Sequence, residues 1–478
     1  MSIRRAASAV HRGNFSGTLK RTCRVALAAG VLSISSASPL LAHDPLPPWT
    51  ESGDFSLPPW AHSVAPKKPE SAIYAEPGKL DLRRGSAQPG ARLPLFGARR
   101  ANGCMGRWLN VGPFAWMCSD VAEFSGEEPS SPVLGARPWT ADGSDSATLE
   151  FLRPPRAGAR TELPPIEPVT ASDDGLPYRY YFAGRDGAYA YASLANALDA
   201  AADQELEAGF VVAIVETKSA HGERWGRTNK GNWVAMREVV PFRPNPFHGE
   251  LLQDDKLDIA WVVADKANVY GSEKGGKATG IRVRFEKVNV FEEKAAPSGA
   301  MVRVSPDHEP PVWMRARDLA RPTLVAPPPE VPEGTSERWI DVDLASQTLV
   351  AYVGKRPVFA TIVSTGKGLP GSEFVTRKGT FRIWVKVFTT KMDNLDREEV
   401  ERHYAIEDVP WVQFFDKAIA LHGAFWHRDF GRVHSHGCVN MAPLDARWVF
   451  AFTAPHLPMG WTAVLPTKVE PGAVVRVR

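Results

Sequence analysis

The sequence predicts a mainly β protein made of several small domains, and three observations lead to this prediction. The chain has 478 residues, which is too long for one ordinary domain. It contains 41 Pro and 39 Gly, residues that interrupt helices and favour turns. Short runs in which apolar and polar residues alternate recur along the chain, such as Gly209–Val215 and Ile281–Phe285, and they suit strands with one buried face.

Residues 1–42 have the composition of a secretory signal peptide. Basic residues without any acidic one precede the apolar run from Val25 to Leu32, and a stretch of small residues follows that ends at Ala42. We expect cleavage after Ala42, with Ala37 as the alternative. An uncleaved anchor is disfavoured because the apolar run is far shorter than the ~20 residues of a membrane span. The sequence therefore predicts export to the periplasm or cell envelope, with membrane contact only through this segment.

The charge balance argues against a nucleic-acid partner. The formal net charge of +3 includes six basic residues of the predicted signal peptide, and without them 51 basic residues face 54 acidic ones. A chain with a slightly negative charge has no general electrostatic attraction to phosphate groups.

The cysteines divide into a close pair and a single distant residue. Removal of the signal peptide leaves Cys104, Cys118 and Cys438. The spacing suggests a local disulfide between Cys104 and Cys118 and an unpaired thiol at Cys438. An unpaired thiol is a liability in an oxidising compartment unless chemistry requires it.

The part of the chain before residue 322 is expected to contain a tether and three small β-units. Residues 43–84 are proline-rich and form the tether. Three segments look like degenerate repeats, each beginning with apolar and aromatic residues near a glycine and closing on a tryptophan: 85–125, 178–242 and 258–321. Residues 126–177 and 322–337 are interpreted as linkers.

The closing tryptophan turn of these units is similar to that of bacterial SH3-like modules, in which a glycine and tryptophan turn precedes the last strand. The alternative is that the three segments are unrelated β-hairpins with core tryptophans. Cys104 and Cys118 fall in the first unit, where a disulfide would join its two halves and stabilise a small core.

A mainly β domain is expected over residues 338–467, followed by a tail at 468–478. The alternating pattern and the turns between the runs predict strands at Trp339–Leu344, Thr348–Tyr352, Pro357–Ser364 and Gly379–Phe388. Two segments resemble short helices, Asp396–Arg402 and Leu444–Phe450.

The most informative motif lies in this last domain. His422 and Gly423 form a pair, and 16 residues after His422 the unpaired cysteine closes the run Ser435-His436-Gly437-Cys438, which Val439 and Asn440 follow. A cysteine nucleophile needs a base, small residues that let a substrate approach, and N–H groups that face a developing oxyanion. The motif contains all three kinds of group.

The pattern resembles the signature of the L,D-transpeptidase (YkuD-type) family, cysteine enzymes that cross-link bacterial peptidoglycan. The similarity covers Arg338 to about Pro466 and includes a second segment, Thr376–Phe381. The resemblance implies that Cys438 is the nucleophile and that His422 is the general base and acid, oriented by the backbone carbonyl of Gly423. It also places three residues on the oxyanion side of the site: Ser435, His436 and Gly437.

Five further residues are candidates for substrate binding: Tyr404, Trp411, Trp426, His427 and Asn440. Each has a structural alternative. The tryptophans can belong to the core, Asn440 can fix its loop, and His427 and His434 can be exposed loop residues. Ser435 and His436 can likewise serve only to form the turn.

The resemblance implies a fold and a reaction. The fold would be an L,D-transpeptidase-type β-sandwich. The substrate would be a peptidoglycan tetrapeptide stem, and an acyl-enzyme on Cys438 would pass to an amine. The product would be a 3→3 cross-link, or a protein attached to the wall. Carbapenems would acylate the same cysteine, and no metal or organic cofactor is implied.

Three alternatives remain open at this point. Water can resolve the same acyl-enzyme, which would make the protein an L,D-carboxypeptidase or a hydrolase. The protein can instead be an inactive wall-binding protein. A zinc site is the third alternative, because residues 434, 436 and 438 would share one face of a strand and join His422 as ligands.

Overall fold

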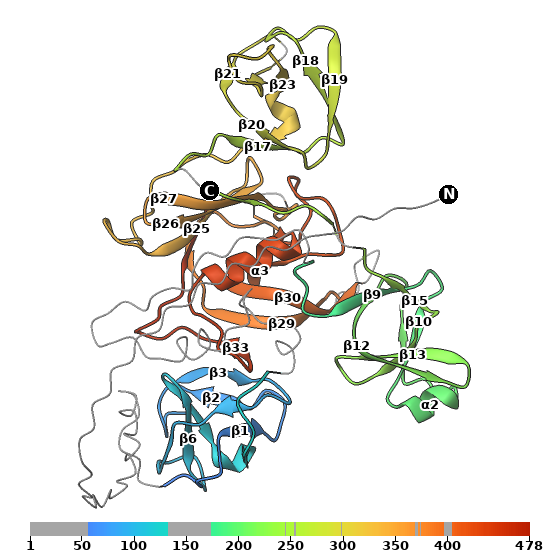
Figure 1. Cartoon of the computed structure of the whole chain (residues 1–478), viewed down its shortest axis with the longest axis vertical. Helices are drawn as coiled ribbons and strands as arrows, with labels where there is room; N and C mark the ends of the chain where they lie inside the picture. Colours follow the sequence, from blue (N-terminus) through green and yellow to red (C-terminus); the bar gives the residue numbers. More distant parts are fainter. Residues whose placement is uncertain are drawn as a thin grey trace, which may run out of the picture. The chain divides into compact units, whose positions relative to one another are not determined.

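The computed structural model describes residues 56–131, 174–243, 245–252, 255–297, 299–368, 371–372, 374–395 and 404–478. The predicted signal peptide, the first part of the tether, most of the 126–177 linker and the predicted helix at 396–402 lie outside these residues. The prediction of a mainly β protein is confirmed (Figure 1). Within the described residues, none of the helices has the length and apolar character that a membrane crossing requires.

The first β-unit is larger than predicted. Its elements are β1 (Ser63–Pro66), β2 (Ala72–Tyr74), β3 (Arg83–Ala87), β4 (Leu93–Pro94), β5 (Gly97–Arg99), β6 (Trp108–Gly112), β7 (Ala115–Cys118), the 3-10 turn η1 (Ser119–Val121) and β8 (Ala122–Ser125). β1 pairs with β4 and β8, and β2 pairs with β3 and β7. The prediction of a tether up to residue 84 is therefore wrong from residue 63 onward. Val64 and Ile73 are fully buried in this unit, so the proline-rich stretch supplies part of its core.

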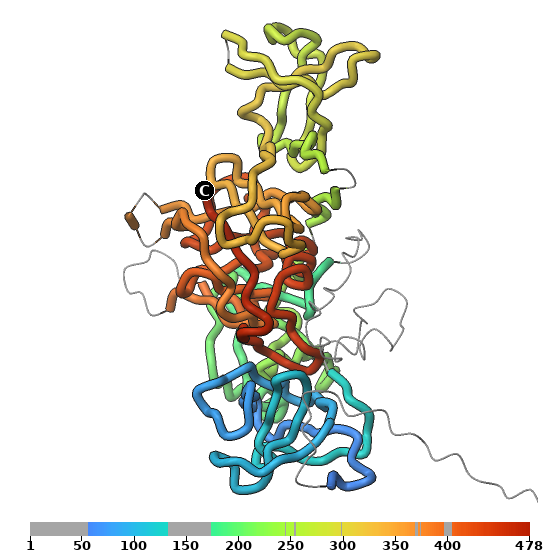
Figure 2. Tube along the Cα trace, turned by 90° about the vertical axis from the view of Figure 1, so that its left-hand side faces the viewer, coloured from blue at the N-terminus to red at the C-terminus, as the bar shows by residue number. Residues whose placement is uncertain are grey.

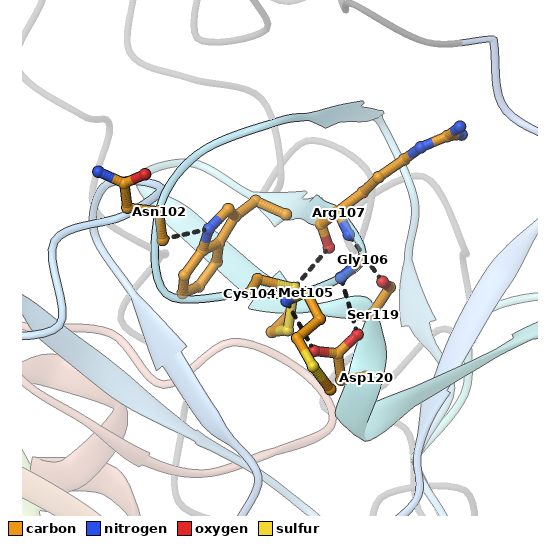
Figure 3. Close-up of a disulfide and its surroundings, with 9 residues drawn as sticks. Asn102, Cys104, Met105, Gly106, Arg107, Ser119 and Asp120 are labelled. Atoms are coloured by element: carbon orange, nitrogen blue, oxygen red, sulfur yellow. Dashed lines mark hydrogen bonds between the residues drawn. A yellow bond between two sulfur atoms is a disulfide. The ribbon is translucent and has the colours of Figure 1, made fainter.

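The predicted disulfide between Cys104 and Cys118 is present (Figure 3). It closes a turn in which the Asp120 carboxylate accepts hydrogen bonds from the backbone N–H groups of Met105 and Gly106, at 2.9 and 3.0 Å. A side chain at Gly106 would place its Cβ 2.2 Å from Ser119 Oγ, so this position requires glycine. The disulfide therefore stabilises a turn that the hydrogen bonds to Asp120 also hold in place.

The second β-unit consists of antiparallel strands and one short helix. Its elements are β9 (Arg179–Ala183), β10 (Ala188–Tyr191), α2 (Leu194–Leu198), β11 (Gln204–Leu206), β12 (Val211–Ala220), β13 (Glu223–Thr228), β14 (Trp233–Ala235) and β15 (Val239–Pro241). β12 pairs with β9 on one side and β13 on the other. Ser193 caps α2, because its side chain accepts a hydrogen bond from Asn196 N.

The third β-unit contains β17 (Ile259–Val262), β18 (Lys266–Tyr270), β19 (Ala278–Val283), β20 (Lys287–Asn289), β21 (Glu292–Lys294), β22 (Met301–Arg303), β23 (Trp313–Arg315), the 3-10 turn η3 (Ala316–Asp318) and β24 (Leu319–Ala320). The expected buried face at Ile281–Phe285 is not observed for β19. Ile281 and Val283 are 58% and 51% exposed, because β19 pairs only with β18 and lies at the edge of its sheet. That any of the three units is SH3-like stays a prediction.

The C-terminal domain begins with a six-stranded sheet in the order β16-β27-β26-β25-β34-β28. Its strands are β16 (Glu250–Leu251), β25 (Arg338–Asp343), β26 (Thr348–Val353), β27 (Arg356–Ile362), β28 (Gly379–Arg382) and β34 (Val474–Val477). The predicted tail at 468–478 is wrong, since β34 runs parallel to β25 and antiparallel to β28. In both Figure 1 and Figure 2 the C-terminus lies beside the strands that open this domain.

The opposite layer holds the candidate site. It contains β29 (Val385–Asp393), β30 (Ala405–Asp416), β31 (Ile419–Gly423), β32 (Val439–Met441) and β33 (Trp461–Val464). The helix α3 (Pro443–Phe452) confirms the prediction at Leu444–Phe450. Trp448 of α3 stacks on Phe359 of β27 at 4.3 Å, and both join the core shared by the two sheets. The helix is thus packed between the layers.

Both of the first two β-units are joined to this layer by strand pairing. β3 pairs antiparallel with β33 through Gly85 and Val464, and β12 contacts β30 in parallel through Val211 and Ile406. Tyr180 also donates a hydrogen bond of 2.6 Å from its hydroxyl to the Asp408 carbonyl.

Candidate active site

His422 lies near the end of β31, inside the protein. It is 1% exposed, and its Nδ1 lies 3.1 Å from the carbonyl oxygen of Gly423. Because a carbonyl only accepts hydrogen bonds, Nδ1 carries the ring hydrogen and the lone pair resides on Nε2. Burial lowers the pKa of His422 to about 4, so the ring is neutral at pH 7. The structure therefore contains the expected contact between the His422 ring and the Gly423 carbonyl.

Cys438 lies immediately before β32, the strand that pairs with the strand of His422. β31 and β32 are parallel, with Leu421 opposite Val439 and His422 opposite Asn440. The Cys438 thiol lies 3.9 Å from the Ala418 carbonyl oxygen, and burial raises its pKa to about 11. Cys438 is the free cysteine of the described chain. The strand register thus places these two residues, 16 positions apart in the sequence, on neighbouring segments of the sheet.

Ser435 and Gly437 form the turn that carries Cys438. Ser435 Oγ donates to the Cys438 carbonyl and accepts from the Gly437 N–H at 3.2 Å. Gly437 has φ +118°, a conformation that other residues adopt only with strain. The Ser435 hydroxyl and the Gly437 N–H are thus bound within the turn, and that Ser435 and Gly437 lie on the oxyanion side stays a prediction. The Cys438 N–H remains the candidate donor to an oxyanion.

His436 differs from its neighbours because its ring is exposed. The ring stacks on Tyr404 at 5.9 Å with an interplanar angle of 11°, and it contacts Phe374 at 4.9 Å. Of the residues expected on the oxyanion side, His436 is thus the one whose side chain lies at the surface. Tyr404, a candidate substrate-binding residue, thus lies next to the turn that carries Cys438.

His427 and Asn440 contact each other rather than the surface. The Asp429 N–H donates to His427 Nδ1 at 3.1 Å, so the hydrogen of this ring is on Nε2. Asn440 Nδ2 lies 2.8 Å from Nε2, and since both atoms would then be donors, we assign the amide the opposite orientation, in which its otherwise unpaired oxygen accepts from Nε2–H. Asn440 is 4% exposed, which assigns it to the loop-fixing alternative instead of substrate binding.

Trp411 does not face the site, which corrects its expected role in substrate binding. It is 3% exposed, its Nε1 donates to the Gly175 carbonyl at 2.7 Å, and its ring packs on Phe388 and Phe450. Trp426 is half-buried and stacks on the His422 ring at 5.7 Å. Trp426 therefore remains a candidate for substrate binding, and it also limits the motion of the His422 ring.

The zinc ligands suggested by the sequence are not assembled. The residues from 434 to 438 form a turn and not a strand, so their side chains do not share one face. Within the described chain, the group near the site that brings possible metal ligands together is His427, Asp429 and His434. The sequence motif did not single out Asp429, although this residue lies between His427 and His434.

Sequence reasoning also missed Thr376 as a residue of the site. Its hydroxyl donates to the Gly437 carbonyl at 2.7 Å and accepts from the Gly366 N–H at 2.8 Å. Thr376 thereby ties the segment before β28 to the turn of Cys438. The resemblance to Thr376–Phe381 was the only signal of its importance.

Residues 337–477 match the L,D-transpeptidase catalytic domain family (YkuD). This part of the chain is thus similar to L,D-transpeptidase catalytic domains. The match covers the β-sandwich described above, including β34. A search of curated proteins finds no match.

Solved L,D-transpeptidase structures are among the similar structures. One from Xylanimonas cellulosilytica is 18% identical, with 31% of this chain and 63% of that chain covered and a TM-score of 0.21. One from Stackebrandtia nassauensis is 24% identical and covers 31% of this chain and 58% of that one, also with a TM-score of 0.21. The catalytic domain from E. faecium is 23% identical, with 30% of this chain and 99% of that domain covered and a TM-score of 0.22. The chain thus spans about three fifths of the first two.

Proposed function

We propose that this protein is an exported cysteine L,D-transpeptidase that acts on peptidoglycan tetrapeptide stems through an acyl-enzyme on Cys438. The observation that carries the proposal is the position of Nδ1 of His422, held by the Gly423 carbonyl, on β31, while Cys438 directly precedes β32, the strand that pairs with β31. This leaves the basic Nε2 for the thiol.

The first half of the reaction forms a thioester. The thiol of Cys438 gives its proton to Nε2 of His422, and the sulfur attacks the carbonyl of the L-centre that precedes the terminal D-alanine. The oxyanion of the tetrahedral intermediate accepts a hydrogen bond from the Cys438 N–H. His422 then returns the proton to the amine of the departing D-alanine.

The second half of the reaction transfers the acyl group. The side-chain amine of a diamino acid on another stem attacks the thioester, His422 takes a proton from that amine, and the thiol of Cys438 is restored. The product is a 3→3 cross-link, or a wall-attached protein when the amine belongs to a protein partner. No step requires a cofactor.

The buried site favours proton transfer only when a substrate is bound. The pKa of His422 is about 4 and that of Cys438 about 11, both because burial disfavours the charged forms. The resting pair is therefore neutral. The exposed ring of His436 and the half-buried Trp426 are the side chains that we assign to contact with the stem.

An L,D-carboxypeptidase or hydrolase is the second candidate function, since water can take the place of the amine. An inactive wall-binding protein is the third, and the His422 and Cys438 geometry speaks against it. We assign the upstream β-units to wall attachment or to control of acceptor access. Residues 1–42 would direct export to the periplasm or cell envelope.

Mass spectrometry of reaction products tests the proposal. Residues 43–478 are incubated with a purified disaccharide-tetrapeptide, beside a Cys438→Ala variant and a carbapenem-treated sample. A dimer that lacks one D-alanine, absent with Cys438→Ala, is the expected result. Free tripeptide without dimer would identify a carboxypeptidase. Absence of turnover and of a carbapenem adduct would leave the wall-binding function.

A further inference from the structure

The loop between His422 and Cys438 contains a cluster of side chains that the proposed reaction does not use. His427, Asp429 and His434 each offer one ligand atom, and these atoms all lie within 4.8 Å of one another. The rings of His427 and His434 are 4.2 Å apart, and Asp429 Oδ2 lies 3.1 Å from His434 Nδ1. Two imidazoles and one carboxylate form a ligand set that suits a zinc-like divalent ion.

We propose that His427, Asp429 and His434 form a binding site for a divalent transition-metal ion, with Zn²⁺ as the best-suited ion. Three protein ligands leave at least one coordination position to water. The site is separate from the His422 and Cys438 pair, although it lies on the same loop.

The tautomer of His427 is the one that a ligand requires. The Asp429 N–H donates to Nδ1, so the lone pair is on Nδ1 and the hydrogen on Nε2, which donates to the Asn440 amide once that amide is turned to present its oxygen. Metal-binding histidines usually donate their second ring N–H to such an acceptor, which fixes the orientation of the ring. Binding would replace one hydrogen bond, that from the Asp429 N–H to Nδ1.

The backbone of the cluster is held in place before any ion binds. Ser364 Oγ donates to the Asp429 carbonyl at 2.7 Å, and the His434 N–H donates to the Thr365 carbonyl at 2.9 Å. Phe430, between the ligands, is fully buried and contacts the His427 ring at 5.2 Å. The three side chains therefore cannot spread apart easily, and a preformed site loses little entropy when it binds an ion.

Access and charge also fit an ion that arrives from solvent. The side chains of Asp429 and His434 are each 43% exposed. Two nearby arginines, Arg432 and Arg284, both pair with Asp265, at 3.2 and 3.6 Å, so this carboxylate offsets part of their charge. Asp429 then supplies a carboxylate to the ion without a competing arginine bond.

Zinc titration of a thiol-free protein tests the site. The full chain with its disulfide oxidised carries Cys23→Ser and Cys438→Ala, so that no free thiol binds the ion. Isothermal calorimetry is expected to show one Zn²⁺ per chain with a Kd below about 100 μM. His434→Gln or Asp429→Asn is expected to weaken binding at least about tenfold, because each removes one of the three ligands.

Matched variants decide the outcome. His308→Gln removes an exposed histidine far from the loop in sequence, 81% exposed, and is expected to leave the Kd unchanged. Thermal midpoints in EDTA verify that each variant is folded. Equal zinc affinity of His434→Gln and the parent would overturn the proposal, as would no bound zinc at about 1 mM free ion. Because Cys438 is absent, neither result depends on transpeptidase activity.

Discussion

At the scale of single residues, His422 and Cys438 form a neutral pair in the resting protein. A free cysteine normally has a pKa near 8.5, and a charged neighbour at the thiol would lower it. Here burial lowers the pKa of His422 to about 4 and raises that of Cys438 to about 11. In the proposed reaction a thiolate would therefore form only as the thiol proton moves to His422.

The pH dependence of alkylation reports this neutral pair. The rate of Cys438 modification by iodoacetamide is expected to rise about tenfold per pH unit from pH 7 to 9, because the thiolate fraction rises in that way below the pKa. A plateau that begins below pH 8 would instead indicate a preformed thiolate and imidazolium.

His422→Gln should slow carbapenem acylation about 100-fold or more, because it removes the proposed general base.

Thr376 supports the Cys438 turn through one hydroxyl with two hydrogen bonds. Thr376→Val removes both and leaves the Gly437 carbonyl and the Gly366 N–H without this partner, inside the protein. We expect the free energy of unfolding to fall by about 1–3 kcal/mol. Carbapenem acylation should also slow, by about tenfold.

Thr380→Val is the matched control for Thr376→Val, since Thr380 is a half-buried threonine of β28 four residues further on. Chemical denaturation and the acylation rate are measured for both variants. An equal loss of stability in the two, with unchanged acylation of Thr376→Val, would contradict the assigned role.

At the scale of elements, β29 holds the end of α3 through a buried lysine. Lys386 is fully buried, and its Nζ donates to the carbonyl oxygens of Phe450 and Thr453, the latter at 2.7 Å. It satisfies carbonyls that the helix terminus leaves open. Burial lowers the pKa of Lys386 to about 7.

This pKa makes the contribution of Lys386 depend on pH. The unfolded chain binds the lysine proton up to its ordinary pKa of about 10.5, whereas the folded protein releases it near 7. Between these values the unfolded state binds more protons, so the contribution of Lys386 to stability increases as pH rises. The thermal midpoint of Lys386→Met should therefore fall further below that of the parent at pH 9.5 than at pH 7. A difference that narrows with pH would contradict this prediction.

Local patterns predicted strands well where a strand buries one face. Trp339–Leu344 and Thr348–Tyr352 coincide with β25 and β26 to within one residue, because both alternate and both lie in the core sheet. The same reasoning was wrong for Ile281–Phe285, where an edge strand exposes apolar residues. The segment at 468–478 was taken for a tail, since strand pairing with β25 is set by residues more than 130 positions away.

For the candidate site, the sequence motif predicted which residues meet but not how each is used. The position of His422 on β31 and of Cys438 directly before the neighbouring β32 agrees with the motif. The internal hydrogen bonds of Ser435 and Gly437 depend on side-chain rotamers, and the burial of Trp411 depends on its contact with Gly175, 236 residues earlier. Neither can be read from spacing along the chain.

At the scale of the whole molecule, the first β-unit is bound to the catalytic domain by more than a linker. β3 extends the layer of β29 and β33, and Arg84, 6% exposed, donates to Glu470 at 2.6 Å. Burial alone would raise the pKa of Glu470, but the hydrogen bond from His456 and the charge of Arg84 lower it to about 2. The pair therefore stays charged, and its contribution is lost only as pH falls from about 4.5 through 2.

Arg84→Met tests whether the first β-unit and the C-terminal domain unfold together. The substitution leaves the Glu470 carboxylate without its cation in a poorly hydrated place, so we expect the free energy of unfolding to fall by about 3 kcal/mol. We also expect the single denaturation transition to separate into two, because the contact of β3 with β33 loses its charged link. Arg92→Met is the control: Arg92 pairs with Glu127 at the surface, where an ion pair contributes at most about 1 kcal/mol. Equal effects of the two variants in guanidinium denaturation would mean that the Arg84 pair does not join the first unit to the catalytic domain.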